Sequence, residues 1–425
     1  MAIIPHEKSS SGGLTLHRIQ TDKYKTTTVV MQFKARLTKD TVTERALLPY
    51  VLQSGTGNYP SSKAVRTELE KLYGATLGVD LAKKGDFHIM TFRMDFANEK
   101  FLSEDEPLFR KALSLLADVV MNPKAGESGF EASIVEKEKR TMKQRIQSIY
   151  DDKMRYSNMR LTQEMFPNEA FGLHVYGEKE EVDRVTAKSL YDYYQKGCAE
   201  DEIDLYLVGN LEGVNAEKVV QELFPFKERS NRSSESTEKA SLDVEEKEIL
   251  ETQEIKQGKL HMGFRSGVGY GDDDYYALQV FNGMFGGFSH SKLFRNVREK
   301  ESLAYYAASR YESHKGLIIV MSGIEFKNYE KTVKIIKEQL TAMVNGDFNE
   351  EEMKQTKTMI RNQLLETVDD AKGMVELLYH GVVSRKLRTV EEWLDGVEAV
   401  SKDDILAVAE KVKLDTVYFL KGEEA

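Results

Sequence analysis

The sequence is poor in cysteine and has no long apolar run. One of its 425 residues is a cysteine, Cys198, so no disulfide can form within the chain, as is usual in a reducing cytosol. No stretch of about 18 apolar residues could span a bilayer as a helix. The first residues lack the basic and apolar blocks of a secretory signal. These absences predict a cytoplasmic protein with no membrane partner.

An excess of positive charge is also missing. The chain has 60 Lys and Arg against 70 Asp and Glu, a formal net charge of -10. Proteins that bind nucleic acid through its phosphates cluster Lys and Arg on one face. The composition therefore argues against a nucleic-acid partner. A length of 425 residues with 40% hydrophobic residues is sufficient for two or more globular domains.

Motifs for metal and phosphate binding are absent as well. The eight histidines never occur in HxxEH or HExxH spacing, so no zinc-peptidase motif is present. The glycine-rich segment GMFGGFSHS (283–291) matches neither GxxxxGK[ST] nor GxGxxG, which argues against phosphate binding. A bent connection between two helices is the structure we expect for it.

One segment, residues 228–257, has the composition of a linker. It is rich in Ser, Glu and Lys and poor in aromatic residues, so it offers little apolar surface to offset the entropy of ordering. It divides the chain into residues 1–227 and residues 258–425. We expect these to be two domains.

The two halves end alike. Near the end of the first half, Thr186 is placed to cap an amphipathic helix that precedes a strand of alternating apolar residues. Ser401 stands at the same place in the second half, and Ile405 occupies the position of Leu190. Both patterns predict a capped helix followed by a strand. A tandem duplication explains the similarity most simply.

Strands and helices alternate in each half in the same order. We expect strands at 14–20, 27–36 and 258–266, and hairpins that join 75–83 to 87–95 and 304–312 to 316–323. Strands interleaved with helix pairs are typical of the α+β class. The prediction is two tandem homologous α/β sandwich domains, each a mostly antiparallel sheet with helices on one face, joined by the polar linker.

Three segments resemble, in the correct order, the pitrilysin/insulinase family of zinc metallopeptidases. They are LLPYVLQSGTGNYPSSKAVRTELEKLYGATLGV, FEASIVEKEKRTMKQRI and FNGMFGGFSHSKLFRNVREKESLAYYAASRY. The first is similar to the surroundings of the inverted zinc motif, and the second to the helix that carries the third zinc ligand. The chain is most similar to bacterial short-chain members, in which two chains of this size form one enzyme.

The resemblance implies a zinc site that has been lost. The family binds zinc through the two His of HxxEH and a second Glu downstream, and the Glu of HxxEH is the general base. Alignment on the SGT turn puts Ala46 and Tyr50 at the His positions and Pro49 at the general base, while Arg145 stands at the ligand Glu. Alanine has no ligand atom, and the charge of arginine repels a metal. We expect no metal bound by this chain and a helix kinked near Pro49.

The second half retains the residues that the family uses on substrate. Arg298 and Tyr305 have the family's spacing of an Arg and a Tyr seven residues apart, which contact substrate near the scissile bond. A guanidinium and a phenol are donors suited to a peptide carbonyl and the charge that develops on it. The alternative is a solvated helix end followed by the start of a strand.

Two further segments allow either a binding or a structural interpretation. Gly78 stands where active members usually carry Asn, on the edge strand that accepts substrate as an added strand, and this favours an ordinary half-buried hairpin. Residues 283–291 resemble the glycine-rich substrate loop of the noncatalytic subunits of mitochondrial processing peptidase. A plain turn remains the alternative there.

The resemblance supports two functional hypotheses. In the first, the chain is the zinc-less subunit of a heterodimeric peptidase that cleaves short or unfolded peptides. An HxxEH-bearing paralogous partner would hold the zinc, and this chain would supply Arg298 and Tyr305. In the second, the chain is a structural or peptide-binding protein with no role in catalysis, and a homodimer is possible. In neither case do we expect activity from this chain alone.

Overall fold

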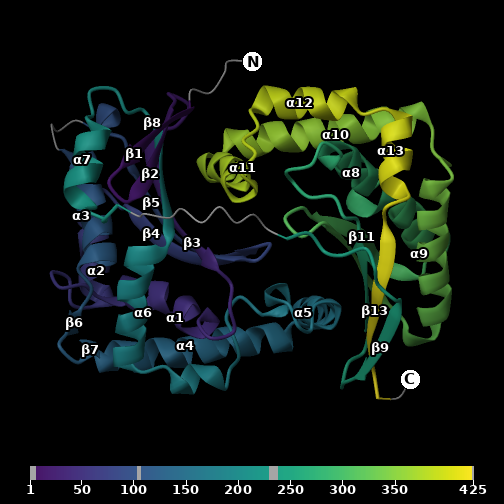
Figure 1. The fold of residues 1–425 in the computed structure, drawn as a ribbon, viewed down its shortest axis with the longest axis horizontal. Helices are drawn as coiled ribbons and strands as arrows, with labels where there is room; N and C mark the ends of the chain where they lie inside the picture. Colours follow the sequence, from purple (N-terminus) through teal and green to yellow (C-terminus); the bar gives the residue numbers. More distant parts are fainter. Residues whose placement is uncertain (1–5, 103–106, 229–237, 424–425) are drawn as a thin grey trace. The chain divides into compact units, whose positions relative to one another are not determined.

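The computed structural model describes residues 6–102, 107–228 and 238–423. They form two compact units: unit 1 comprises residues 1–148 and 173–235, and unit 2 comprises residues 149–172 and 236–425, as far as these are described. Each unit contains one large sheet (Figure 1). Residues 229–237, inside the expected linker, lie outside the described residues.

The sheet of unit 1 has the strand order β1-β2-β8-β3-β5-β4. Its strands are β1 His6–Ser11, β2 Leu14–Gln20, β3 Thr26–Arg36, β4 Thr76–Lys84, β5 Phe87–Ala97 and β8 Glu202–Gly209. All neighbours are antiparallel except β2 and β8, which are parallel. The expected hairpin is therefore present, and β4 forms one edge of the sheet.

Helices α1, α3 and α6 pack on this sheet. The helices of unit 1 are α1 Val42–Ser54, α2 Ser62–Lys71, α3 Leu108–Met121, α4 Ala132–Asp151, α6 Ala187–Glu200 and α7 Ala216–Leu223. Its short elements are the turns η1 Glu99–Phe101 and η3 Glu181–Arg184 and the strand pair β6 Ala125–Gly126 and β7 Gly129–Phe130. The Thr186 side chain caps α6 in a reciprocal capping box with Ser189, as the sequence predicts.

A buried arginine fixes α1 to its neighbours. Arg45 is fully buried, and its Nη1 donates to Asp201 Oδ2 at 2.6 Å. Nη2 donates to the Phe33 carbonyl at 2.7 Å, and Nε donates to the His88 carbonyl at 3.1 Å. Nη1 also donates to the Tyr193 hydroxyl at 3.0 Å. The opposite charge and the four acceptors compensate the cost of burying a guanidinium. The helix that carries the expected zinc positions is thereby held against β3 and β5.

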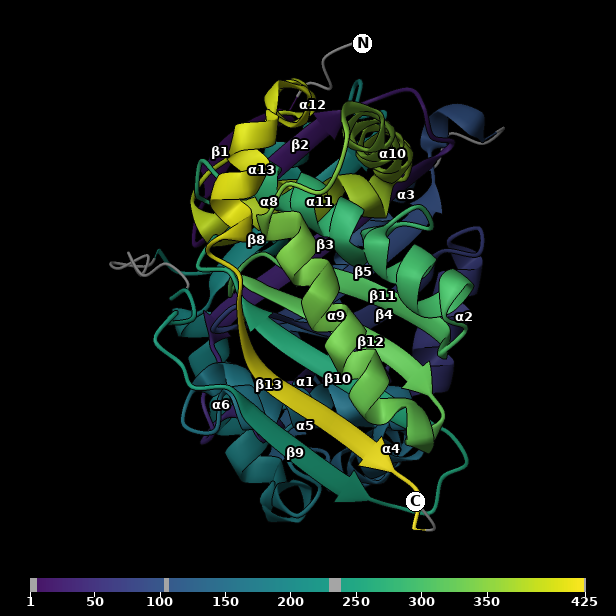
Figure 2. The same cartoon turned by 90° about the vertical axis from the view of Figure 1, so that its right-hand side faces the viewer.

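The sheet of unit 2 has the strand order β11-β12-β10-β13-β9, and its five strands lie side by side in Figure 2. The strands are β9 Lys247–Thr252, β10 Gly258–Arg265, β11 Ala304–Glu312, β12 Leu317–Ile324 and β13 Lys413–Lys421. Strand β9 falls within the segment expected as a linker, yet it pairs in parallel with β13. The sequence does not reveal this strand, because both of its faces carry polar side chains and no apolar face alternates with a polar one.

Helices lie on both faces of this second sheet. The helices of unit 2 are α5 Lys153–Met165, α8 Tyr275–Asn282, α9 Tyr329–Val344, α10 Glu350–Asp369, α11 Ala371–Ser384, α12 Val390–Ala399 and α13 Lys402–Ala409, with π-helical turns η4 Gly283–Gly287 and η5 Phe294–Lys300 and short 3-10 turns η2 Ala170–Gly172 and η6 Phe326–Asn328. A Cβ atom at Gly263 of β10 would lie 2.2 Å from Met165 Sδ of α5. The next residue, Phe264, contacts Phe285 of η4. Since successive side chains of a strand point to opposite faces, α5 and η4 cover opposite faces.

The two sheets repeat one topology. The order β2-β8-β3-β5-β4 of unit 1 matches β9-β13-β10-β12-β11 of unit 2, and the single parallel pair comes first in both. Ser401 caps α13 as Thr186 caps α6, and Ile405 and Leu190 are both fully buried. The α+β class and the tandem arrangement are confirmed. Among the described residues, no helix combines the length and apolar character needed to cross a bilayer.

Candidate functional site

The structure places all four residues that the resemblance aligns with a zinc site in unit 1. Ala46, Pro49 and Tyr50 lie on α1 and are buried, and Arg145 lies on α4. The guanidinium carbon of Arg145 lies 3.6 Å from the centre of the Tyr50 ring. The side chain at one His position thus stacks against the side chain at the position of the ligand Glu. A partly buried cation–π contact of this kind contributes about 0.5–2 kcal/mol.

A hydrogen bond also joins the two helices. Ser54 Oγ at the end of α1 donates to Glu138 Oε1 on α4 at 2.7 Å. The Lys137 ammonium lies 3.1 Å from the same oxygen. The Glu138 carboxylate is therefore already bound to a hydroxyl and a cation. Burial and the adjacent Tyr176 hydroxyl raise the pKa of Tyr50, which keeps its phenol neutral.

These residues do not fit a zinc ion. Ala46 is fully buried and has no ligand atom, and the cation of Arg145 lies against the ring of Tyr50. Zinc sites need three or four N, O or S ligands at bonding distance. Across residues 6–102, 107–228 and 238–423, no group of three or more His, Cys, Asp or Glu side chains could hold a metal.

Arg298 and Tyr305 lie at the surface of unit 2. Arg298 is exposed in the last turn of η5, with its guanidinium carbon 4.6 Å from the centre of the Phe294 ring. Tyr305 is 80% exposed on β11. Ser302, in the turn between them, has φ of 52°, a conformation that few residues other than glycine adopt. Both side chains present free donor groups to solvent.

A β-bulge determines where Tyr305 points. The pairing of β11 with β12 shifts between Ala304 and Tyr306, which leaves Tyr305 as the extra residue. Bulges turn a side chain out of the regular alternation and are frequent beside functional sites. The spacing of Arg298 and Tyr305 does not reveal this bulge, because one unpaired residue leaves no signal in the sequence. β11 is also an edge strand.

The other edge strand of interest, β4, is open at Gly78. No atom lies within 4 Å of a Cβ atom placed there. The residue therefore provides no side chain at the edge of the unit 1 sheet, where active family members usually present Asn. Nothing in its surroundings requires glycine.

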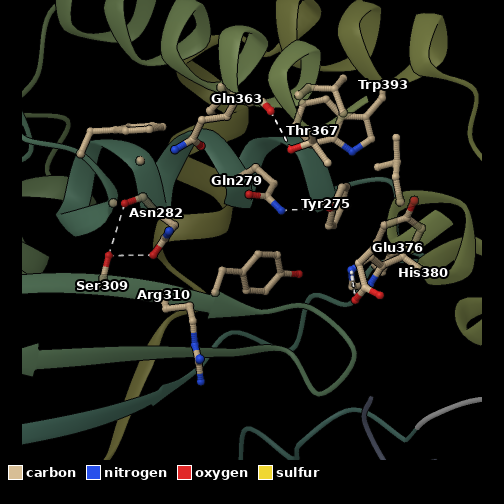
Figure 3. A pocket seen from close by; sticks show the side chains of 18 residues that line it. Tyr275, Gln279, Asn282, Ser309, Arg310, Gln363, Thr367, Glu376, His380 and Trp393 are labelled. Carbon is tan, nitrogen blue, oxygen red and sulfur yellow. Dashed lines mark hydrogen bonds and ion pairs between the residues drawn. The ribbon is translucent and has the colours of Figure 1, made fainter. Parts of the chain in front are cut away.

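A cavity in unit 2 was not predicted from the sequence. It has a volume of about 370 Å³ and lies between α8, α10, α11 and β11 (Figure 3). Ser309 Oγ donates to Asn282 Oδ1 at 2.7 Å, and Gln279 Nε2 donates to the Tyr275 hydroxyl at 2.9 Å. Trp393, the single tryptophan of the chain, lines the cavity. Aromatic rings and amides of this kind suit an uncharged ligand with an apolar ring.

The glycine-rich segment forms part of the wall of this cavity. Gly283 and Gly287 of η4 line it. A Cβ atom at Gly283 would lie 2.6 Å from Thr356 Cγ2 of α10, and one at Gly286 would lie 2.6 Å from Ser309 Oγ of β11. These glycines allow η4 to approach both elements closely. This is the structural role expected of a bent connection. The glycines of residues 283–291 were also the one signal in the sequence that could have indicated the cavity.

Comparison with known proteins identifies the family. A family profile described as "Peptidase M16 inactive domain" matches residues 184–360. The chain is 50% identical to the "Probable inactive metalloprotease YmfF" of Bacillus subtilis strain 168, over 100% of this chain and 99% of that protein. It is 23% identical to the "Uncharacterized zinc protease YmxG" of the same strain, over 71% of this chain and 72% of the relative.

Solved structures agree with this relationship. A conserved protein from Enterococcus faecalis V583 is 33% identical and superposes with a TM-score of 0.91, with 99% of each chain covered. A peptidase M16 inactive domain from Pseudomonas fluorescens has a TM-score of 0.79 at 16% identity, with 99% of this chain and 98% of the other covered, and it shows the shared fold. The chain therefore belongs to the peptidase M16 family, as an inactive metalloprotease-like member.

Proposed function

We propose that this chain is the zinc-less subunit of a heterodimeric M16 peptidase that cleaves short or unfolded peptides. A paralogous chain with an intact HxxEH helix supplies the zinc and the general base. This chain supplies Arg298 and Tyr305, which donate hydrogen bonds to the substrate near the scissile peptide bond. Donors aimed at a developing oxyanion are among the largest contributions to the catalysis of acyl transfer.

The observation that carries the proposal is the contrast between the two sites. In unit 1 the zinc positions are filled by Ala46, Tyr50 and Arg145, and the latter two are stacked together. In unit 2, Arg298 and Tyr305 keep the family spacing, and both are exposed. The exposed phenol on a bulged edge strand is available to a substrate, whereas a purely structural tyrosine would more often be packed against its neighbours.

The second candidate function is peptide binding without a role in turnover. It rests on the same exposed pair and on the cavity that contains Trp393. In that case the chain would be a binding or structural protein that retains the fold of the peptidase. The presence of an HxxEH-bearing chain in the purified complex separates the two candidates.

The test begins with affinity purification of the chain from its own cells, followed by mass spectrometry and zinc analysis. A stoichiometric HxxEH-bearing partner with one zinc per pair is the expected result. The two chains are then mixed, and hydrolysis of a short quenched fluorescent peptide is measured. Tyr305→Phe removes one hydroxyl, and Arg298→Gln removes the charge. We expect each change to lower kcat/KM by about 100-fold, the usual loss for one oxyanion donor.

Tyr306→Phe is the matched control. It removes a hydroxyl from the adjacent residue, whose own oxygen is buried and has no hydrogen-bond partner among the described residues. Turnover should not change with this variant. If Tyr305→Phe leaves turnover unchanged while the dimer remains intact, the assigned role is wrong. If the chain is purified as a zinc-free homodimer, peptide binding without catalysis becomes the better description.

A further inference from the structure

The side chain of Arg145 has donor capacity that the protein does not use. Its Nη1 is buried and has no hydrogen-bond partner among the described residues. An unsatisfied buried donor costs about 1–3 kcal/mol, and more when the group is charged. The residue as a whole is only half-buried, so some of its other atoms lie at the surface. An acceptor supplied from outside the chain would remove this cost.

The stack with Tyr50 leaves the hydrogen-bonding directions of the guanidinium open. The ring lies against the group at 3.6 Å from its central carbon and so occupies one of its faces. The N–H bonds of a guanidinium lie in its plane, and they form a fork that matches a carboxylate. A guanidinium held flat on a ring is therefore already oriented for an in-plane anion.

Two carboxylates of unit 1, one on α4 and one that acts on Tyr50, have other partners. Glu138, on the same helix, accepts from Ser54 Oγ at 2.7 Å and lies 3.1 Å from the Lys137 ammonium. Asp80, whose charge helps to raise the pKa of Tyr50, is exposed and accepts from the Leu81 amide at 2.9 Å. The phenol of Tyr50 is neutral, and its hydroxyl interacts with that of Tyr176. Arg145 thus presents its cation beside a neutral ring.

From this arrangement we infer that the former zinc position is a carboxylate-binding site, in which Arg145 holds the carboxylate of a peptide. The loss of the metal has reversed the ligand preference of the site. A zinc site binds the carbonyl oxygen of a peptide bond and a water molecule. A guanidinium on an aromatic ring prefers a full negative charge, as at a peptide C-terminus or on an acidic side chain. The site belongs to this chain alone, so the inference goes beyond the proposed function and needs no partner.

Fluorescence anisotropy of the purified chain tests the inference with three short peptides of one mixed sequence. The first has a free C-terminal carboxylate and no acidic residue, the second has a C-terminal amide, and the third has the amide and one internal Asp. We expect the first to bind about 10- to 100-fold more tightly than the second, the range for a charge-assisted hydrogen bond. If only the third exceeds the second, the carboxylate comes from a side chain.

Variants of α4 complete the test. Arg145→Gln should abolish the difference between the carboxylate and amide peptides, and Arg145→Lys should retain part of it, because the charge remains without the fork. Arg140→Gln is the matched control, since Arg140 is an exposed arginine on the same helix. Equal binding of all three peptides to the unmodified chain would overturn the inference and leave water as the acceptor of Nη1. Equal weakening of all three peptides by Arg145→Gln would also overturn it, because it would indicate a structural role only.

Discussion

By its resemblance to zinc peptidases, this chain differs from them at four side chains of unit 1 that align with the metal site. Ala46 removes a ligand, and Pro49 removes a base. Tyr50 and Arg145 replace two further ligands with a stacked pair. Because α1 is held in place by Arg45 and its four acceptors, the backbone at these positions does not depend on a bound metal.

Restoring all four residues should restore metal binding. The variant with Ala46→His, Pro49→Glu, Tyr50→His and Arg145→Glu recreates HxxEH and the third ligand, and we expect about one zinc per chain by elemental analysis after dialysis. The three α1 changes alone, with Arg145 retained, should bind far less, because a cation remains at the ligand position. A folded fourfold variant without zinc would contradict the alignment of this chain with the family.

Single elements show how far the sequence predicts the fold. The hairpins of β4 with β5 and of β11 with β12 were predicted to within about two residues, because alternation of apolar side chains is a local signal. The capping residues Thr186 and Ser401 were predicted because the residue type at the start of a helix is also a local signal. β9 was missed since its charged residues resemble a linker. The cavity beside η4 was missed because it depends on contacts between distant segments.

On β10, a buried histidine should make the stability of unit 2 depend on pH. His261 is fully buried, and neither ring nitrogen has a hydrogen-bond partner among the described residues. Burial lowers its pKa to about 3, so the folded chain keeps the ring neutral. The unfolded chain takes up a proton as the pH falls below about 6.5, and the folded state therefore loses stability between about pH 6.5 and pH 3.

We expect the melting temperature to fall as the pH is lowered from 7.5 to 4.5, and to fall less steeply for His261→Leu. Each such group contributes about 1.4 kcal/mol per pH unit within its window. Burial also lowers the pKa values of His6 and His174 to about 4. These two residues steepen the dependence of melting temperature on pH in the unmodified chain and in His261→Leu alike. Circular dichroism melts across this range provide the measurement. Parallel curves for the two proteins would show that His261 does not contribute.

At the scale of the whole molecule, a helix from the first half of the sequence completes unit 2. The Tyr156 hydroxyl and Arg160 Nε of α5 donate to Glu251 of β9 at 2.5 Å and 3.2 Å. Arg265 Nη2 donates to the Met165 carbonyl at 3.0 Å. Composition gives no indication that residues 149–172 belong to unit 2, because their amino-acid composition resembles that of the neighbouring segments. The domain boundaries at 227 and 258 stay a prediction from composition.

The close approach of α5 to β10 depends on Gly263, and a substitution there tests it. Gly263→Ala puts a Cβ atom against Met165 Sδ and should cost about 1–3 kcal/mol through overpacking, seen as a lower urea midpoint and faster proteolysis within residues 149–172. Gly78→Ala, a strand glycine with open surroundings, should change stability by about 0.5 kcal/mol or less. When Met165 is first replaced by Ala, Gly263→Ala should lower the free energy of unfolding by less, because the atoms that the new Cβ would meet are gone. An undiminished cost would show that α5 is not the group displaced.

The position of β13 has a consequence for synthesis on the ribosome. This strand follows every other strand of unit 2 in the sequence, yet it lies between β10 and β9 in the sheet of unit 2. Until it emerges, β9 has no partner strand, and the surface of β10 that pairs with β13 remains open. The nascent chain must carry these unpaired edges from the synthesis of β9 and β10 until β13 has emerged. The nascent chain therefore has a specific need for chaperone protection until β13 has paired, since exposed strand edges promote aggregation.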